Sequence, residues 1–256
     1  MDKYRVTAID GLHGGPSIRV NEEKNPGDHG GYPLANLLDA RTFSIEGEVF
    51  TGNIAKMRDL EQAMRTAFYS MVERPLIMRT GNAALDVYIM CRINDQIGLR
   101  EEQSKMDRFR RSFRIPLRAT DPRIYSVQRR TYREEAIEDG DNLILPTNAG
   151  NWPAAPKLHF EGPMIDPVVL NATFMPDESF QRQLKINGTI ASGDIYTYDA
   201  QLGTLTDQTG ERKDAQLDVS SREIRLTTGE NQLQLSTTGT EDGISAFEVS
   251  FQDTWV

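Results

Sequence analysis

Hydrophobic and polar residues alternate in several segments of the first half of the chain. Residues 41–50 alternate regularly, with apolar side chains on one parity and polar ones on the other: Phe43, Ile45 and Val49 against Thr42, Ser44, Glu46 and Glu48. Because successive side chains of a strand point to opposite faces, this period of two predicts a strand with one buried face. Residues 85–93 and 106–119 follow the same rule, and a short run at 75–79 predicts a fourth strand.

A helical pattern follows the first of these strands. Asn53 is a suitable N-cap, because its side-chain oxygen can accept a hydrogen bond from a free amide of the first turn. Beyond it, apolar residues recur at steps of three and four, which places them on one helical face: Met57, Leu60, Met64, Ala67, Phe68 and Met71. Pro75 cannot continue a helix. The pattern predicts one amphipathic helix of about 19 residues, packed on the strands in an α+β arrangement.

The second half of the chain contains only short strand patterns. They occur at near-even spacing, at residues 142–145, 157–160, 168–174, 183–186, 194–198, 215–219, 223–227, 231–236 and 247–251. Turn-forming pairs such as Asn187–Gly188 and Thr228–Gly229 separate them. Short strands at this spacing favour an antiparallel sandwich or jelly roll. The predicted fold class is therefore mainly β, with one packed helix in the first half.

Glycine, proline and charge indicate the domain organisation. Residues 11–40 hold many turn formers and predict a long surface loop or arm. Residues 121–155, rich in charge and then in Asn, Gly and Pro, are interpreted as a connector. We therefore expect an N-terminal domain over residues 1–120 and a C-terminal sandwich over residues 156–256. Whether the last strand, residues 247–256, returns to the N-terminal domain stays open.

Charge is distributed unevenly over the 256 residues. Residues 1–120 carry 18 Lys and Arg against 16 Asp and Glu, whereas residues 121–256 carry 11 against 22, so the net charge of −9 arises in the second half. We expect no specific nucleic-acid site, because phosphate contacts need clustered cations. No apolar run is as long as a membrane span, and the first residues lack the basic-then-apolar order of a signal peptide. Synthesis in the cytoplasm is therefore expected.

Few residues suit metal or covalent chemistry. The single cysteine, Cys91, excludes a disulfide framework, and three widely spaced histidines disfavour a metal centre. Cys91 and His159 lie on predicted strands and are interpreted as structural. Residues 138–141, Glu-Asp-Gly-Asp, suit a calcium loop in charge, but a solvated acidic turn is preferred because EF-hand features are missing. Since no nucleotide-binding or hydrolase motif occurs, we expect no cofactor, no metal and no catalysis.

One aromatic segment suits sugar binding. Asp194 and Asp199 flank Tyr196 and Tyr198, so the rings could stack on a sugar while the carboxylates accept hydrogen bonds from its hydroxyls. The simpler interpretation is the ordinary alternation of a strand, with the two tyrosines turned inward or placed at an edge.

An arginine row is the sharpest physical feature of the sequence. Arg108, Arg110, Arg114 and Arg118 share the polar face of the strand predicted at 106–119. Four cations on one face repel each other unless carboxylates oppose them. Two interpretations remain open: a solvated face paired with acidic side chains of the neighbouring strand, or an interface with an acidic surface such as another subunit.

Several degenerate stretches occur in a recognisable order along the chain. One is an amphipathic strand that runs directly into an Ala-x-Asp-Pro-x-x-Tyr ending at residues 119–125. The full set comprises residues 41–49, 113–125, 148–156, 160–171, 193–198, 226–231 and 247–255. Together these stretches cover most of the chain from residue 41 onward. In this order they resemble the distal tail protein (Dit) family of long-tailed bacteriophages, also called the siphovirus-type tail component family.

This resemblance implies a structural protein of the virion. Dit proteins form a hexameric ring at the distal end of the tail tube, so the implied partners are further copies of the chain, the tail tube ring, the tail-tip protein and receptor-binding proteins. The implied folds are a β-sandwich-like N-terminal domain with a helix, which builds the ring, and a galectin-like C-terminal sandwich. The alternatives are a carbohydrate-binding module for host cell-wall sugars and, ranked last, a wall glycosidase.

Overall fold

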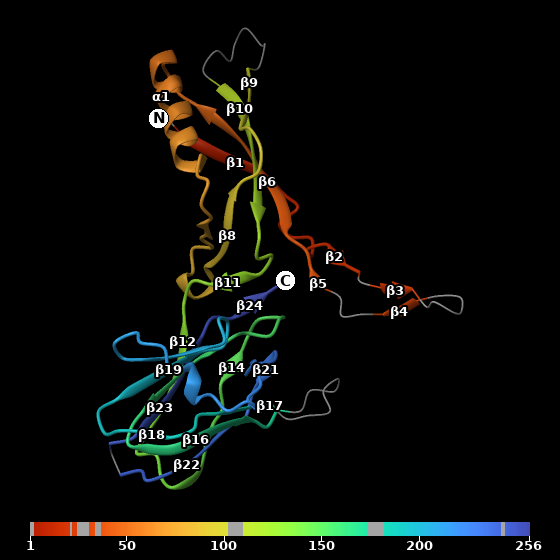
Figure 1. Cartoon of the computed structure of the whole chain (residues 1–256). Helices are drawn as coiled ribbons and strands as arrows, with labels where there is room; N and C mark the ends of the chain where they lie inside the picture. The colour runs from red at the N-terminus through yellow and green to blue at the C-terminus, as the bar shows by residue number, and fades with distance from the viewer. Residues whose placement is uncertain are drawn as a thin grey trace. The chain divides into compact units, whose positions relative to one another are not determined.

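The computed structural model divides the chain into two compact units. It describes residues 3–20, 22–24, 31–33, 37–101, 110–173, 182–241 and 244–256. Unit 1 comprises residues 1–78, 87–124 and Val256, and unit 2 comprises residues 79–86 and 125–255. Each unit has its own cluster of buried apolar side chains. The chain is mainly β, and the described residues contain one α-helix, as the hydrophobic pattern of the sequence predicted (Figure 1).

Unit 1 is built on an antiparallel sheet. Its central strands follow the order β1-β6-β10-β8, with bounds Lys3–Asp10, Arg41–Phe50, Arg110–Ala119 and Val87–Ile93. Strand β7 (Arg74–Met78) pairs with β8, and β9 (Gly98–Glu101) pairs with β10. All four strands predicted in this half are present, with the described part of the fourth beginning at Arg110.

The core of unit 1 lies where β6 and β10 pair along their whole length. Ile45 stands opposite Ile115, and Gly47 stands opposite Phe113. A Cβ atom at position 47 would lie 2.4 Å from the Phe113 ring, so only glycine leaves room for that side chain. The predicted inward residues of β6, and those of β10 within the described range, are buried, and Ser44 is buried as well despite its polar parity.

Helix α1 (Ile54–Phe68) contributes to the same core. Asn53 caps it as predicted, because its Oδ1 accepts a hydrogen bond of 2.8 Å from the Ala55 amide. Met57 and Met64 are buried among the strand residues. The expected length of 19 residues was wrong: the backbone leaves helical geometry at Tyr69, and Met71 is 79% exposed. The Ser70 hydroxyl donates to the Val72 carbonyl, a local turn that competes with the helix.

The segment between β1 and β6 contains short ladders. Strand β2 (Ile18–Arg19) pairs with β5 (Leu37–Leu38), and β3 (Glu22–Lys24) pairs with β4 (Gly31–Pro33). The described parts of the predicted arm therefore form narrow antiparallel ribbons (Figure 1).

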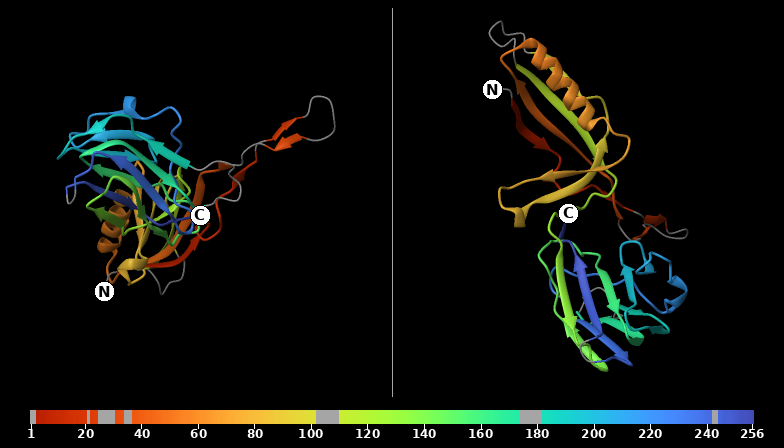
Figure 2. Two further views of the ribbon diagram at one scale, coloured as in Figure 1. Left: turned by 90° about the horizontal axis from the view of Figure 1, so that it is seen from below. Right: turned by 90° about the vertical axis from the view of Figure 1, so that its left-hand side faces the viewer.

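Unit 2 contains two five-stranded antiparallel sheets around one core (Figure 2). The first has the order β12-β23-β15-β19-β20, with bounds Arg130–Glu135, Ala246–Phe251, Lys157–Glu161, Ile195–Asp199 and Thr204–Asp207. The second has the order β13-β22-β16-β17 with β18 on β16, and its bounds are Gly140–Ile144, Leu233–Thr238, Met164–Asn171, Arg182–Lys185 and Thr189–Ile190.

Shorter elements complete the described structure. Strand β11 (Ile124–Ser126) pairs with β24 (Thr254–Trp255), and β14 (Thr147–Asn148) pairs with β21 (Gly229–Glu230). Two single turns of 3₁₀ helix, η1 and η2, span Ala83–Leu85 and Asp214–Gln216.

Two predicted strands of the second half are absent. Residues 215–219 begin in the 3₁₀ turn η2, and Asp218 then forms a side-chain turn by accepting hydrogen bonds from the Ser220 amide and hydroxyl. Residues 223–227 are not a strand either, although Ile224 and Leu226 are fully buried and Leu226 forms an isolated bridge with Ala154. The apolar alternation predicted burial correctly at 223–227 but not at 215–219, where Val219 is 98% exposed and the turn-forming Asp218 determines the backbone geometry.

Candidate functional site

The arginine row of β10 lies on the sheet face opposite the core of unit 1. Phe113, Ile115 and Leu117 point into the core, so Arg110, Arg114 and Arg118 share the other face, as the pattern predicted. Arg108, the fourth member of the row, lies outside the described residues.

Carboxylates of β6 oppose two of these arginines. Arg110 forms an ion pair with Glu48, and Arg114 Nε lies 3.3 Å from Glu46 Oε1, directly across the ladder. The Arg114 pair is weak because its side chain is 63% exposed to solvent. Arg111 points to the core side, where it pairs with Glu61 of α1. For Arg110 and Arg114 the structure therefore agrees with a face neutralised by its neighbouring strand.

Arg118 has a different environment. It stands directly opposite Arg92 of β8 and, on its other side, opposite Thr42 of β6. Both arginines are exposed, and neither forms an ion pair with any residue in the described ranges. Arg92 and Arg118 therefore stand side by side on one face of the sheet with no carboxylate of the described residues paired to either of them.

The same face carries two shallow polar hollows. One, of about 290 Å³, is lined by residues that include Thr7, Glu46, Glu48, Arg100 and Arg114. A second of similar volume is lined by residues that include Asp10, Thr42, Ser44, Asn94 and Arg114. Small-molecule sites are usually enclosed and mostly apolar, so these hollows fit a surface that contacts protein better than a ligand pocket.

The four residues considered for sugar binding do not form one site: the two tyrosines lie in the core, and the two aspartates lie at the ends of β19. Tyr196 and Tyr198 alternate with exposed or partly buried residues on β19 and point into the core of unit 2, where burial raises the pKa of Tyr198. In this conformation neither ring offers a free face for a sugar. Asp194 accepts a hydrogen bond from Gln208. Asp199, the last residue of β19, accepts from the Gln201 and Leu202 amides of the turn that follows and forms an ion pair with Lys157.

Cys91 and His159 occupy structural positions. Burial, together with the nearby Glu73 carboxylate, raises the pKa of the Cys91 thiol to about 11, so it carries no thiolate at neutral pH. His159 lies on β15 with Nδ1 2.9 Å from the Thr197 hydroxyl, and burial lowers its pKa. Within the described ranges no three His, Cys, Asp or Glu side chains are grouped so as to hold a metal ion.

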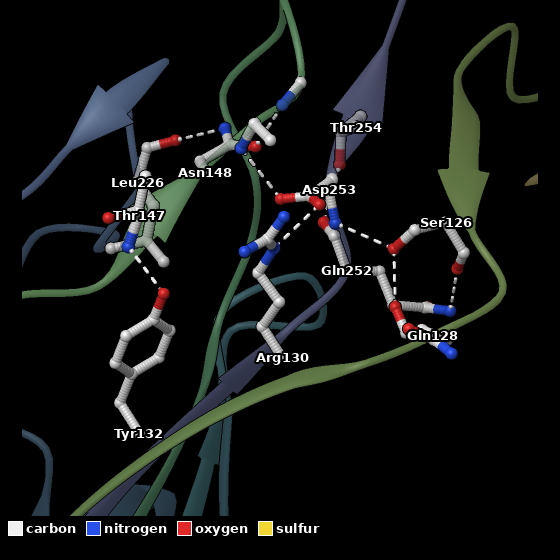
Figure 3. A network of polar contacts seen from close by, with 12 residues as sticks. Ser126, Gln128, Arg130, Tyr132, Thr147, Asn148, Leu226, Gln252, Asp253 and Thr254 are labelled. Atoms are coloured by element: carbon white, nitrogen blue, oxygen red, sulfur yellow. Dashed lines mark hydrogen bonds and ion pairs between the residues drawn. The ribbon is translucent and has the colours of Figure 1, made fainter. Parts of the chain in front are cut away.

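A buried polar network in unit 2 was not predicted from the sequence. Asp253 is its centre: Oδ2 accepts from Arg130 Nε at 2.8 Å, and Oδ1 accepts from the Ala149 amide at 2.8 Å (Figure 3). The Asp253 amide donates to the Ser126 hydroxyl, while Gln252 donates to the Ser126 carbonyl. Because Asp253 is buried, the two bonds to its carboxylate satisfy a charge that would otherwise be costly.

The adjoining turn completes this network. Asn148 donates from Nδ2 to the Trp152 and Leu226 carbonyls and accepts from the Gly150 amide with Oδ1. A Cβ atom on Gly150 would lie 1.9 Å from the Thr254 carbonyl oxygen, so the close approach of the two segments requires glycine. The Asn- and Gly-rich composition of residues 148–151 is the signal that could have indicated such a turn. The network holds residues 252–254 in place and is structural.

The fold of the whole chain matches that of a solved phage protein. The crystal structure of the SPP1 Dit (gp 19.1) protein, described as a paradigm of the hub adsorption apparatus of phages that infect Gram-positive bacteria, aligns with a TM-score of 0.71. The alignment covers 99% of this chain and 94% of that chain at 15% identity. The chain has the fold of a phage Dit protein. The Dit-like order of sequence stretches is thereby matched by three-dimensional structure.

Other solved structures are less similar to this chain. Chains from the phage P2 baseplate in its activated conformation with Ca and with Sr align at 11% identity, with TM-scores of 0.46 and 0.44, over 97% of this chain and 90% of each of those chains. No family model and no curated protein matches the sequence. None of the helices in the described ranges is long and apolar enough to cross a membrane.

Proposed function

We propose that the protein is a structural component of a phage tail tip, acting as a Dit-type hub. The observation that carries this proposal is the fold: the alignment with a phage hub protein extends over nearly the whole of both chains and includes both units. The order of the Dit-like stretches along the sequence supports the same proposal. The role is one of binding and assembly, and its location is the distal end of the tail in the virion after synthesis in the host cytoplasm.

The proposed assembly is a ring of six copies that joins the tail tube to the tail-tip and receptor-binding proteins. A ring needs a heterologous contact, in which one patch of a copy meets a different patch of the next. Unit 1 builds this ring and unit 2 faces outward in the proposal. Six copies would carry a net charge of about −54, six times −9, which favours solubility before docking.

The mass of the protein in solution tests this proposal. A ring of six copies has a mass of about 173 kDa, six times 28.9 kDa, which light scattering and native mass spectrometry separate clearly from a monomer. For the isolated protein at high concentration we expect a ring of six copies. When the tail tube protein is added, we expect a larger complex. A chain that stays monomeric at every concentration, alone and with the tube protein, would contradict the proposal.

A further inference from the structure

The turn between β17 and β18 contains the one Asn-Gly pair of the sequence, Asn187–Gly188. Both residues are exposed, and Gly188 has a φ of 107°. Because glycine has no side chain, its amide nitrogen can approach the side chain of the preceding asparagine more closely than the amide nitrogen of another residue can. This pair is therefore the position of the chain at which deamidation meets the least steric resistance.

Deamidation joins two atoms of this pair. The Gly188 amide nitrogen gives up its proton and attacks Cγ of Asn187, a C–N bond closes a succinimide ring, and Nδ2 leaves as ammonia. Water then opens the ring at either carbonyl and leaves aspartate or isoaspartate, with no oxidation or reduction. The reaction therefore needs a Gly188 nitrogen released from its hydrogen bond and an Asn187 side chain that is free to turn toward it.

Carboxylates from two other segments hold both reacting groups. The Gly188 amide donates to Asp166 Oδ1 at 2.7 Å, and the Gly188 carbonyl accepts from the Asp166 amide at 2.9 Å. Asn187 Nδ2 donates to Asp218 Oδ2 at 3.2 Å, and the Asn187 amide donates to the Gln216 carbonyl at 2.7 Å. Deprotonation of the Gly188 amide is also unfavourable here, because the resulting anion would face the Asp166 carboxylate.

Asp218 stays ionised in this contact. Hydrogen bonds from Ser220 and then from Asn187 lower the pKa of Asp218 to about 2. At neutral pH its carboxylate therefore accepts the hydrogen bond from Asn187 and has no proton to give to a leaving ammonia.

We propose that Asn187 is a protected deamidation site, in which Asp166 holds the attacking nitrogen and Asp218 holds the leaving group. The hydrogen bonds of the turn must open before the succinimide ring can close, so the reaction proceeds only from a locally open state. A deamidated product would place a second carboxylate against Asp218 and loosen the turn further. The protection belongs to the single chain and does not depend on the proposed ring.

The rate of deamidation tests the protection. Peptide mass spectrometry after incubation at mildly alkaline pH measures the conversion of Asn187 to aspartate and isoaspartate, and a synthetic peptide of residues 182–192 is the unstructured reference. The folded wild-type chain should react at least about tenfold more slowly than the peptide, because hydrogen bonds to ionised groups stabilise the closed turn. This comparison needs no variant and stands even if a variant fails to fold.

Two variants test the two carboxylates separately. Asp166 has a positive φ of 46°, which glycine adopts freely, so Asp166→Gly removes the carboxylate without backbone strain. Asp166→Gly and Asp218→Ala should each raise the rate in the folded chain by about three- to tenfold, because each removes one hydrogen bond that must otherwise open. The chain that carries both changes should react within about threefold of the peptide.

Two further variants are matched controls. Ser220→Ala removes the hydroxyl that donates to Asp218 but leaves the carboxylate that binds Asn187, so the rate should stay within about twofold of the wild type. Asp166→Asn keeps an acceptor for the Gly188 amide and tolerates a positive φ, so it should react more slowly than Asp166→Gly.

Three outcomes would overturn the proposal. A folded wild-type chain that reacts as fast as the peptide has no protection. If Asp166→Gly and Asp166→Asn both lower the rate, Asp166 is a base that removes the Gly188 proton and therefore promotes the reaction. If the wild-type chain is slow and neither carboxylate variant changes its rate, the protection does not come from Asp166 and Asp218. Tryptophan fluorescence of each variant confirms that unit 2 is folded.

Discussion

At the scale of single residues, the fold depends on a few positions where two segments approach closely or a buried charge is satisfied. The buried Asp253 carboxylate accepts hydrogen bonds from Arg130 and the Ala149 amide, while the Asp253 amide donates to the Ser126 hydroxyl. The hydrogen bond to Asp253 raises the pKa of Arg130, which remains charged in any case. Glycine at positions 47 and 150 leaves space that a methyl group would fill. These positions predict large effects from small changes.

Replacing Gly150 by alanine should destabilise unit 2 strongly. The added Cβ would lie within 3 Å of three backbone atoms of Thr254, none of which is a flexible side-chain end. The loss in the free energy of unfolding should be about 2–3 kcal/mol. Urea unfolding followed by tryptophan fluorescence measures it, since Trp152 lies in this turn. The control is Gly52→Ala, whose Cβ has no neighbour within 4 Å and which should change stability little.

His159 makes stability depend on pH. Burial lowers its pKa in the folded chain below the ordinary value of 6.5, so the unfolded chain binds a proton first as the pH falls. The contribution of neutral His159 is therefore complete above pH 6.5 and is lost as the pH falls below it. Glu248 opposes the shift, while Lys157 and Arg129 support it. His159→Gln should lose less thermal stability than the wild type between pH 7 and pH 5; equal losses would refute this assignment.

At the scale of elements, the sequence predicted those strands and helices whose geometry depends on side-chain burial within one segment. The strands β6 and β10 and the start of α1 follow from alternation and from Asn53 alone. Strand β12 was missed because its sequence, RTYREE, is almost entirely polar and its pairing with β23 determines its geometry. The partners of the arginine row depend on the register of β10 with β6 and β8. The pattern of one segment alone does not determine this register.

The cap of α1 should be measurable on its own. Asn53→Ala removes the acceptor for the Ala55 amide and should lower the stability of unit 1 by about 1 kcal/mol. Far-ultraviolet circular dichroism during urea unfolding reports the helix. Asn53→Asp keeps an acceptor at this position and should stay close to the wild type, so equal loss in both variants would show that the cap contributes nothing.

The pairing of β6 with β10 can be tested through its charges. Arg110→Glu places two carboxylates together at the Glu48 position and should lower the stability of unit 1 by about 1 kcal/mol, because the pair is only partly buried. Adding Glu48→Arg restores opposite charges and should recover most of the loss. A ring that disappears while the unfolding midpoint stays unchanged would instead make Arg110 part of the contact between copies.

At the scale of the whole molecule, two separate cores divide the chain into units that can be probed independently. Both tryptophans, Trp152 and Trp255, lie in unit 2, and the single described α-helix lies in unit 1. Fluorescence and the helical dichroism signal therefore report different units. Asn53→Ala should shift only the dichroism transition, and Gly150→Ala should shift the fluorescence transition first. If both variants moved both signals equally, the two cores would unfold as one.

The ribbon between β1 and β6 begins and ends at strands that are already hydrogen-bonded neighbours. Asp10 of β1 stands opposite Ser44 of β6 in the ladder. The two strands can therefore pair in the same way whatever the length of the segment that joins them. Doubling the length of a loop costs only about 0.6 kcal/mol in closure entropy. Evolution can therefore lengthen, trim or exchange this excursion without disturbing the sheet beneath it, and a grafted peptide at the same place would be carried just as easily.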